Sequence, residues 1–248
     1  MKNLFLTISN RKITFTFIFL LISAGLIFNS CKEEKQIDIA FEAYGDMFIQ
    51  KKTVDDEVVY APYYYLFANS SMNSASVETP SGESMALEPF EYLTTYINEP
   101  GEDEFTTSMA ELGSYHFTGT YEDNKPFDIT DIFDGRVIGF PQIDSLAYDE
   151  SDYSVYVSWE LVGGADIYKV KLANAAGNIV FNGAELTSES NAFKINLDTE
   201  GWTITPYTGD VFTLQLHAFA FDGDAGDDDW YYNIECDSYT EAQVVWGE

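Results

Sequence analysis

Apolar and polar residues alternate along most of the chain, and this period of two predicts β-strands. In residues 36–45, Ile37, Ile39 and Phe41 alternate with Asp38, Ala40 and Glu42, as expected for a strand with one buried face. Gly, Pro, Asn and Asp residues that favour turns separate further segments of this kind. In the first half of the chain these segments are residues 57–69, 74–80, 114–123 and 135–141.

The pattern predicts a second set of strands after Pro141, a residue that cannot continue a central ladder. Gly177, in the sequence "NAAGN", supplies the positive φ of a hairpin turn within that set. No segment keeps a helical period. The nearest, residues 85–97, contains Pro89 and suits a strand better. The second set comprises residues 154–161, 167–174, 178–186, 192–198, 211–222 and 239–246.

Residues 143–248 resemble a fibronectin type III or related immunoglobulin-like domain. The resemblance rests on "VSW" ending at Trp159, "ADIY" ending at Tyr168, and "GDVF" ending at Phe212. It implies that Trp159 and Tyr168 pack together in a core, and that Phe212 stands where a Tyr is usual. We therefore expect an all-β protein of two tandem immunoglobulin- or fibronectin type III-like β-sandwiches, over residues 37–140 and 141–248.

The N-terminal segment has the features of an export signal. Lys2, Arg11 and Lys12 precede 16 uncharged residues, 13–28, and the apolar run ends at Ser30 and Cys31. A run this short is typical of a signal peptide rather than a spanning helix. The ending is similar to the lipobox of bacterial lipoproteins, which implies removal of residues 1–30, lipid attachment to Cys31 and a tether over residues 31–36. The alternatives are an uncleaved signal anchor, a secretory signal cut near Ser30 and an intracellular protein.

Charge narrows the range of partners. Without residues 1–30, the chain has nine Lys and Arg against 42 Asp and Glu, a formal charge of −33. Such a charge repels phosphate backbones and so excludes nucleic acid as a partner. It also disfavours binding of the protein surface to anionic lipid, which leaves the lipid chain as the membrane anchor. The resemblance to lipoproteins, with Lys32 after the Cys, favours the outer membrane, on its periplasmic or cell-surface side.

Few residues suggest catalysis. His116 and His217 both lie within alternating segments, where a structural or surface role is expected, and Cys236 is expected to be a buried thiol. The sequence contains no "GxSxG", "HExxH", "CxxC" or phosphate-binding glycine motif. We therefore expect that the protein is not an enzyme and needs no cofactor, with calcium as the one cofactor left open.

An acidic cluster is the candidate for that calcium. Five carboxylates lie within eight residues, with two glycines between them, and calcium takes oxygen ligands from such loops. The EF-hand pattern fails, because Gly226 and Asp227 occupy its fifth and sixth positions. We expect a solvated loop, and weak calcium binding is the alternative. The candidate metal ligands are Asp222, Asp224, Asp227, Asp228 and Asp229.

Aromatic side chains are the candidates for ligand binding. In residues 57–69, Tyr63, Tyr65 and Phe67 share one face of the predicted strand, and the opposite face is aromatic as well. Trp230 and Tyr232 follow the acidic cluster. One possibility is a binding platform of Tyr63, Tyr65, Trp230 and Tyr232, and the other is packing at a domain junction.

These features support two hypotheses of different classes. The first is a non-catalytic cell-envelope lipoprotein that binds a glycan or a protein. Its tether and sandwiches look like those of the accessory lipoproteins of polysaccharide-uptake systems. The second is a structural spacer or assembly subunit without a small-molecule ligand. Exposed aromatic residues at the end of a sandwich would favour the first hypothesis, and aromatic residues buried at the domain junction would favour the second.

Overall fold

The computed structural model describes residues 40–90, 92–223 and 233–247. The chain divides into two compact units, residues 1–40 and 41–248, and every element of the described ranges lies in the second. In these described ranges, every regular element is a strand except a short 3-10 helix, η1 (Glu102–Glu104). No helix within them is long and apolar enough to cross a membrane.

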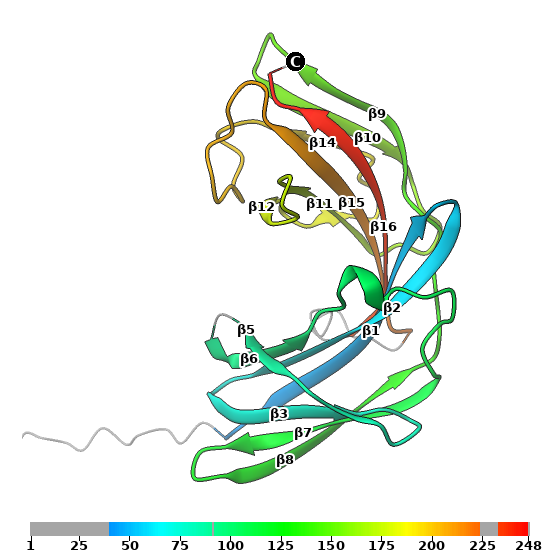
Figure 1. Ribbon diagram of the computed structural model, residues 1–248, viewed down its shortest axis with the longest axis vertical. Helices are drawn as coiled ribbons and strands as arrows, with labels where there is room; N and C mark the ends of the chain where they lie inside the picture. Colours follow the sequence, from blue (N-terminus) through cyan, green and yellow to red (C-terminus); the bar gives the residue numbers. More distant parts are fainter. Residues whose placement is uncertain (1–39, 91, 224–232, 248) are drawn as a thin grey trace, which may run out of the picture. The chain divides into compact units, whose positions relative to one another are not determined.

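The strands form three sheets (Figure 1). The largest has nine strands, in the order β12 (Ile179–Asn182), β11 (Ile167–Ala173), β15 (Val211–Phe221), β16 (Ile234–Val245), β1 (Ala43–Val54), β2 (Glu57–Ala68), β6 (Tyr92–Asn98) and β5 (Glu88–Phe90), with β13 (Leu186–Thr187) paired to β11. The second consists of β14 (Ala192–Ile195), β10 (Ser154–Glu160) and β9 (Gln142–Asp149). The third consists of β4 (Ser84–Ala86), β3 (Met72–Glu78), β7 (Gly113–Tyr121) and β8 (Lys125–Phe133).

One hydrophobic core lies between the three-stranded sheet and the β11–β15–β16 part of the large sheet. As the alternation predicts, Leu214, Leu216 and Ala218 of β15 are buried in it. Trp159 and Tyr168 pack in the same core, with ring centroids 5.5 Å apart. The contact implied by the fibronectin type III pattern is therefore confirmed, and so is the burial of Cys236.

A second core lies between the four-stranded sheet and the β1–β2–β6 part of the large sheet. Tyr64 and Leu66 of β2 are buried in it together with Tyr115 and Phe117 of β7. Each sandwich thus has its own core, and the predicted fold class, all-β with tandem fibronectin type III-like sandwiches, is confirmed.

The two sandwiches share the large sheet through the first and last strands. Strand β1 pairs in parallel with β16, with Ile49 opposite Cys236 and Lys51 opposite Ser238. This pairing joins residues almost 190 positions apart, so no local pattern in the sequence predicts it. The predicted boundary near Pro141 stays a prediction, because residues 41–248 form one contact unit around two cores.

The segment between the sandwiches corrects one predicted strand. Residues 135–141 were expected to form a strand, but residues 134–141 have no regular structure. Hydrogen bonds with side chains, rather than pairing with another strand, hold this segment in place. Glu235 Oε1 accepts hydrogen bonds from the backbone N–H groups of Asp134, Gly135 and Arg136, at 3.0, 2.7 and 3.1 Å. Lys51 Nζ donates to the carbonyl oxygen of Ile138 at 2.6 Å.

Other local predictions have mixed outcomes. The strand expected from residue 36 begins at Ala43, and residues 36–39 lie outside the described ranges. Strands β8 and β9 were not predicted. Residues 85–97 do contain strands, β4, β5 and β6, and Gly177 has the expected positive φ, 82°.

Candidate functional site

Exposed apolar side chains gather at one end of the C-terminal sandwich. Strand pairing places several chain segments there: β15 begins opposite the end of β16, Val211 opposite Val245, and the end of β14 lies beside the start of β10, Ile195 opposite Val155. Tyr207 is 72% exposed and Leu197 is 53% exposed. We call this group the tip surface, and it consists of Tyr153, Ile179, Leu197, Ile204, Tyr207 and Val211.

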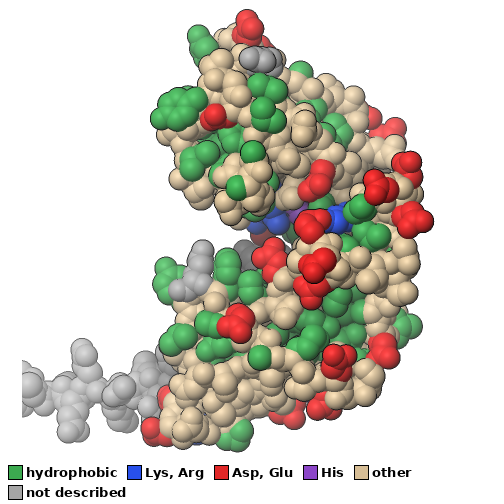
Figure 2. Space-filling view, viewed as in Figure 1, with side chains coloured by type: hydrophobic (Ala, Val, Ile, Leu, Met, Phe, Trp, Pro, Cys, Tyr) green, Lys and Arg blue, Asp and Glu red, His purple; other side chains and the backbone are tan. Residues whose placement is uncertain are grey.

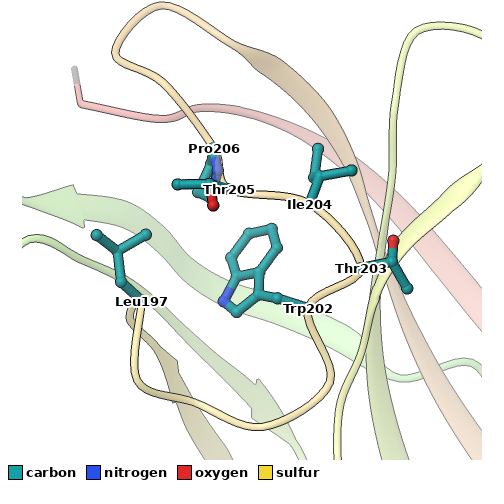
Figure 3. Close-up of a pocket in the computed structure, with 6 residues that line it drawn as sticks. All are labelled: Leu197, Trp202, Thr203, Ile204, Thr205 and Pro206. Carbon is teal, nitrogen blue, oxygen red and sulfur yellow. The ribbon is translucent and has the colours of Figure 1, made fainter.

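A pocket of about 530 Å³ opens within the tip surface. Figure 3 shows the indole of Trp202 at its centre, with Leu197 on one side and Thr205 and Pro206 above. Its lining therefore combines one large ring, aliphatic side chains and threonine hydroxyls. The residues that line the pocket are Leu197, Trp202, Thr203, Ile204, Thr205 and Pro206.

Trp202 is fixed in this pocket by both its nitrogen and its ring. Nε1 donates a hydrogen bond to the carbonyl oxygen of Asn196 at 2.9 Å. The ring packs against Phe181, Trp246 and Phe212, with centroids 4.9, 5.4 and 6.1 Å away. A ring held by the core on one side and half-exposed on the other offers a preorganised contact surface, which lowers the entropic cost of binding.

The loop that carries Trp202 depends on a glycine. Gly201 has φ of 117°, and a Cβ on it would lie 2.2 Å from the carbonyl oxygen of Asn182. The residues after it are tied down at Thr203, whose backbone N–H donates to the carbonyl oxygen of Val180 at 2.9 Å. The sequence analysis missed this site. The available signal was the alternation of Trp202 and Ile204 with threonines in a segment between two predicted strands.

The predicted platform residues Tyr63 and Tyr65 lie elsewhere, on β2. They face away from the core, are half-buried, and share that face with Phe67 as predicted. The ring of Tyr63 stacks on Phe48 with centroids 4.8 Å apart, and burial raises the pKa of its hydroxyl. The structure does not bring Tyr63 and Tyr65 to the tip surface, and their role in binding stays a prediction.

Most of the other predicted site residues cannot be placed. Cys31, Asp224, Asp227, Asp228, Asp229, Trp230 and Tyr232 lie outside the described residues. Asp222 is described, and it contacts Glu235: burial, with the carboxyls of Asp222 and Asp134, raises the pKa of Glu235 to about 9. Within the described ranges, no three His, Cys, Asp or Glu side chains gather in a way that could hold a metal. Calcium binding by the acidic cluster therefore stays a prediction.

The two histidines are placed differently. His116 is half-buried on β7, and its Nδ1 lies 3.1 Å from Thr130 Oγ1. His217 is buried on β15, with Nδ1 2.8 Å from Asp237 Oδ1. Burial lowers its pKa, against the opposing effect of Asp237. Because side chains alternate along β16, Cys236 and Ser238 point to the opposite face of the sheet from this His–Asp pair.

Comparison with known proteins adds little to this picture. No protein-family model matches the sequence, and no curated protein matches it. Among solved structures, the chain is similar to a two-domain fibronectin type III segment of chicken tenascin, with 14% sequence identity and a TM-score of 0.28. The match covers 82% of this chain and 99% of the tenascin segment. A tetra-tandem repeat from the extending region of a large adhesion protein has 11% identity and a TM-score of 0.26.

Enzymes also occur among the similar structures. A β-1,2-glucanase from Parabacteroides distasonis has 10% identity and a TM-score of 0.31 over 83% of this chain. The chain spans half of the adhesion-protein repeat and 36% of the glucanase. Likeness at this level identifies neither a ligand nor an activity.

Proposed function

We propose that this protein is a non-catalytic lipoprotein of the bacterial outer membrane that binds a glycan or a protein through its tip surface. The observation that carries the proposal is the pocket around Trp202. Soluble monomers rarely expose clustered apolar side chains without a binding role. The tip surface is such a cluster of exposed apolar side chains, and it occurs in a chain that is otherwise strongly acidic, with a formal charge of −30.

A sugar ring suits the chemistry of this pocket. A half-exposed aromatic ring offers an apolar face for stacking, and threonine hydroxyls nearby can donate and accept hydrogen bonds. Asp198 and Glu200 are exposed in the chain segment between Leu197 and Trp202, and their negative charges disfavour an anionic ligand. The preferred ligand is therefore a neutral glycan, and a protein with an apolar or basic contact surface is the alternative.

The membrane anchor is part of the proposal. Its support is the apolar segment that ends at Ser30 and Cys31. The mature protein, released from membranes and examined by mass spectrometry, should begin at acylated Cys31, and Cys31→Ala should free the protein from the membrane or leave the precursor uncleaved. A membrane-bound mature protein that still begins at Met1 would contradict the anchor.

The absence of catalysis is also proposed rather than tested. Its support is the placement of the buried His–Asp pair, which shares its face of the sheet with neither Cys236 nor Ser238. Within the described residues, the polar groups that line the tip pocket are threonines, which lack an acid or base of suitable pKa on their own.

A ligand screen tests the proposal. The soluble chain from Lys32 onward should bind selected neutral glycans on an array, or retain one protein partner reproducibly in a pull-down from the envelope. Binding of neither would contradict the binding function and favour a spacer.

The spacer remains a second candidate because of how the segment between the sandwiches is held. Arg136 donates to the carbonyl oxygens of Phe221 and Gly164, at 2.6 and 3.1 Å. These bonds add to the N–H bonds that Glu235 accepts and to the bond that Lys51 donates. A rod-like spacer needs such a fixed junction. A binding protein can use the same junction to present its ligand site.

A further inference from the structure

A second group of exposed apolar side chains lies in the N-terminal sandwich, at the end of β5 and the start of β6. Tyr92 is 72% exposed, Leu93 is 53% exposed and Phe90 is 47% exposed. We call these three residues the β5–β6 surface. Figure 2 shows hydrophobic side chains gathered at this edge of the molecule. No core residue of either sandwich belongs to this group.

The β5–β6 surface lies at the end of the sheet where the chain enters it. Strand pairing shows this directly: Thr95 of β6 is opposite Phe67 of β2, and Ala68 of β2 is opposite Ala43 of β1. Glu42 and Asn69 are joined by two hydrogen bonds at the same end, of 3.0 and 3.1 Å. Neighbouring strands are about 4.8 Å apart, so two strand spacings separate Leu93 from the entry of the chain by about 10 Å.

The length of the preceding chain limits how far this end can lie from the anchor. Nine residue steps separate Cys31 from Ala40, the first described residue. A fully extended chain spans at most about 3.6 Å per residue, so Cys31 lies within about 32 Å of Ala40. A tether of this length allows the β5–β6 surface to reach the bilayer when Cys31 carries an acyl chain.

We propose that the β5–β6 surface contacts the lipid bilayer and sets the orientation of the anchored protein; the inference rests on the proposed lipid anchor. Tyr, Phe and Leu fit the boundary between headgroups and acyl chains, where an apolar ring or branch can be buried while a hydroxyl stays wet. Glu42, Glu122 and Lys125 lie at this end, and Lys125 forms an ion pair with Glu122 at 2.8 Å. The net charge of these three residues is negative, so the lipid surface that fits is zwitterionic rather than anionic.

The sheet topology determines where the tip surface lies when the β5–β6 surface contacts the bilayer. Strands β1 and β16 run parallel and overlap only over residues 49–51 and 236–238. Strand β16 therefore continues in the direction of β1, from the entry of the chain to the tip surface. Bilayer contact at the β5–β6 surface directs the Trp202 pocket away from the membrane, where a glycan or protein outside can reach it.

Depth measurements on the lipidated full chain test the inference. Tyr92→Cys and Leu93→Cys would each carry a fluorescent bimane label, with the protein bound to phosphatidylcholine vesicles. Labelling is selective, because Cys236 is fully buried and Cys31 is acylated in the proposed anchor. Tyr153→Cys, at the tip surface, is the matched control. We expect lipids brominated near the headgroups to quench the labels at positions 92 and 93 and to leave the label at 153 unquenched.

Three other outcomes would each overturn the inference in a distinguishable way. If the protein floats with the vesicles but all three labels are quenched only by aqueous iodide, the anchor stands and the bilayer contact is wrong. Labels at 92 and 93 that are shielded from both quenchers, with a dimer in sedimentation, would show that a second copy covers this surface. Failure to float with the vesicles would contradict the anchor itself, and the inference with it.

Discussion

Trp159 and Glu235 show two ways in which single residues fix this structure. Trp159 is placed by alternation, because each residue of β10 with an inward side chain meets the core. Glu235 is placed by its hydrogen bonds to the three backbone N–H groups of Asp134, Gly135 and Arg136. The first role could be predicted from the pattern and the fibronectin type III resemblance. The second could not, since its partners lie about 100 residues away.

Replacement of Trp159 by Ala should destabilise the protein by about 3–5 kcal/mol, because it leaves a large cavity beside Tyr168. Urea unfolding monitored by circular dichroism measures this free energy. Tyr156→Ala, in the same strand on the exposed face, is the control and should cost less than about 1 kcal/mol. A similar small loss for Trp159→Ala would remove the support for its place in the core.

The raised pKa of Glu235 makes stability depend on pH. Its value of about 9 in the folded protein exceeds the ordinary 4.5 because of burial and the carboxyls of Asp222 and Asp134. Between these values the folded protein keeps a proton that the unfolded chain loses, so the free energy of unfolding falls as pH rises. This contribution is complete below pH 4.5 and is lost as pH rises through about 9.

Glu235→Gln should reduce that slope. A Gln oxygen can accept the same three N–H bonds, and its amide stays neutral at every pH. Urea unfolding at several pH values between 5 and 9 should give a flatter profile for the variant. Part of the slope should persist, because burial also raises the pKa of Asp46. An unchanged slope would mean that Glu235 ionises normally in the folded protein.

Among the elements, strands with a regular alternation of apolar and polar residues were predictable and irregular segments were not. The pattern of β15 gave both its extent and its faces, with Leu214 and Leu216 inward. The strand predicted over residues 135–141 was wrong. An apolar segment can bury its side chains without strand pairing when other side chains form the hydrogen bonds that its backbone needs. Strand β1 continues through Lys51 and Lys52 although charges interrupt the pattern. The Lys51 ammonium group donates a hydrogen bond to the carbonyl oxygen of Ile138, and Lys52 forms an ion pair with Glu102. Both ammonium groups therefore have polar partners.

The loop between β14 and β15 depends on Gly201 more than on its other glycine. Gly209→Ala should cost about 1–2 kcal/mol, because φ there is 91° but nothing lies near the added Cβ. Gly201→Ala should cost more, since its Cβ would also meet the Asn182 carbonyl oxygen. Urea unfolding of both variants checks the order, and equal losses would contradict the close approach at Gly201.

In the molecule as a whole, one sheet connects the end where the chain enters to the tip surface. Parallel pairing of β1 with β16 makes the C-terminal sandwich depend on a strand from the start of the chain. Residues 141–248 contain every buried residue of the C-terminal core except Ile138, so they should still unfold cooperatively. Their melting temperature should be lower than that of residues 32–248, because β16 loses its pairing with β1 and the core loses Ile138. A molten fragment would show that the two sandwiches share one folding unit.

The central claim, ligand binding at the tip surface, has a matched test in two leucines. Leu197 lines the Trp202 pocket and Leu93 lies in the N-terminal sandwich, and both are 53% exposed. With the soluble chain from Lys32 and the ligand selected by the screen, titration calorimetry should show affinity about tenfold lower for Leu197→Ser, the effect of about 1.4 kcal/mol. Leu93→Ser should bind like the unchanged protein. Equal affinities for both variants and the unchanged protein would contradict a binding site at the tip surface.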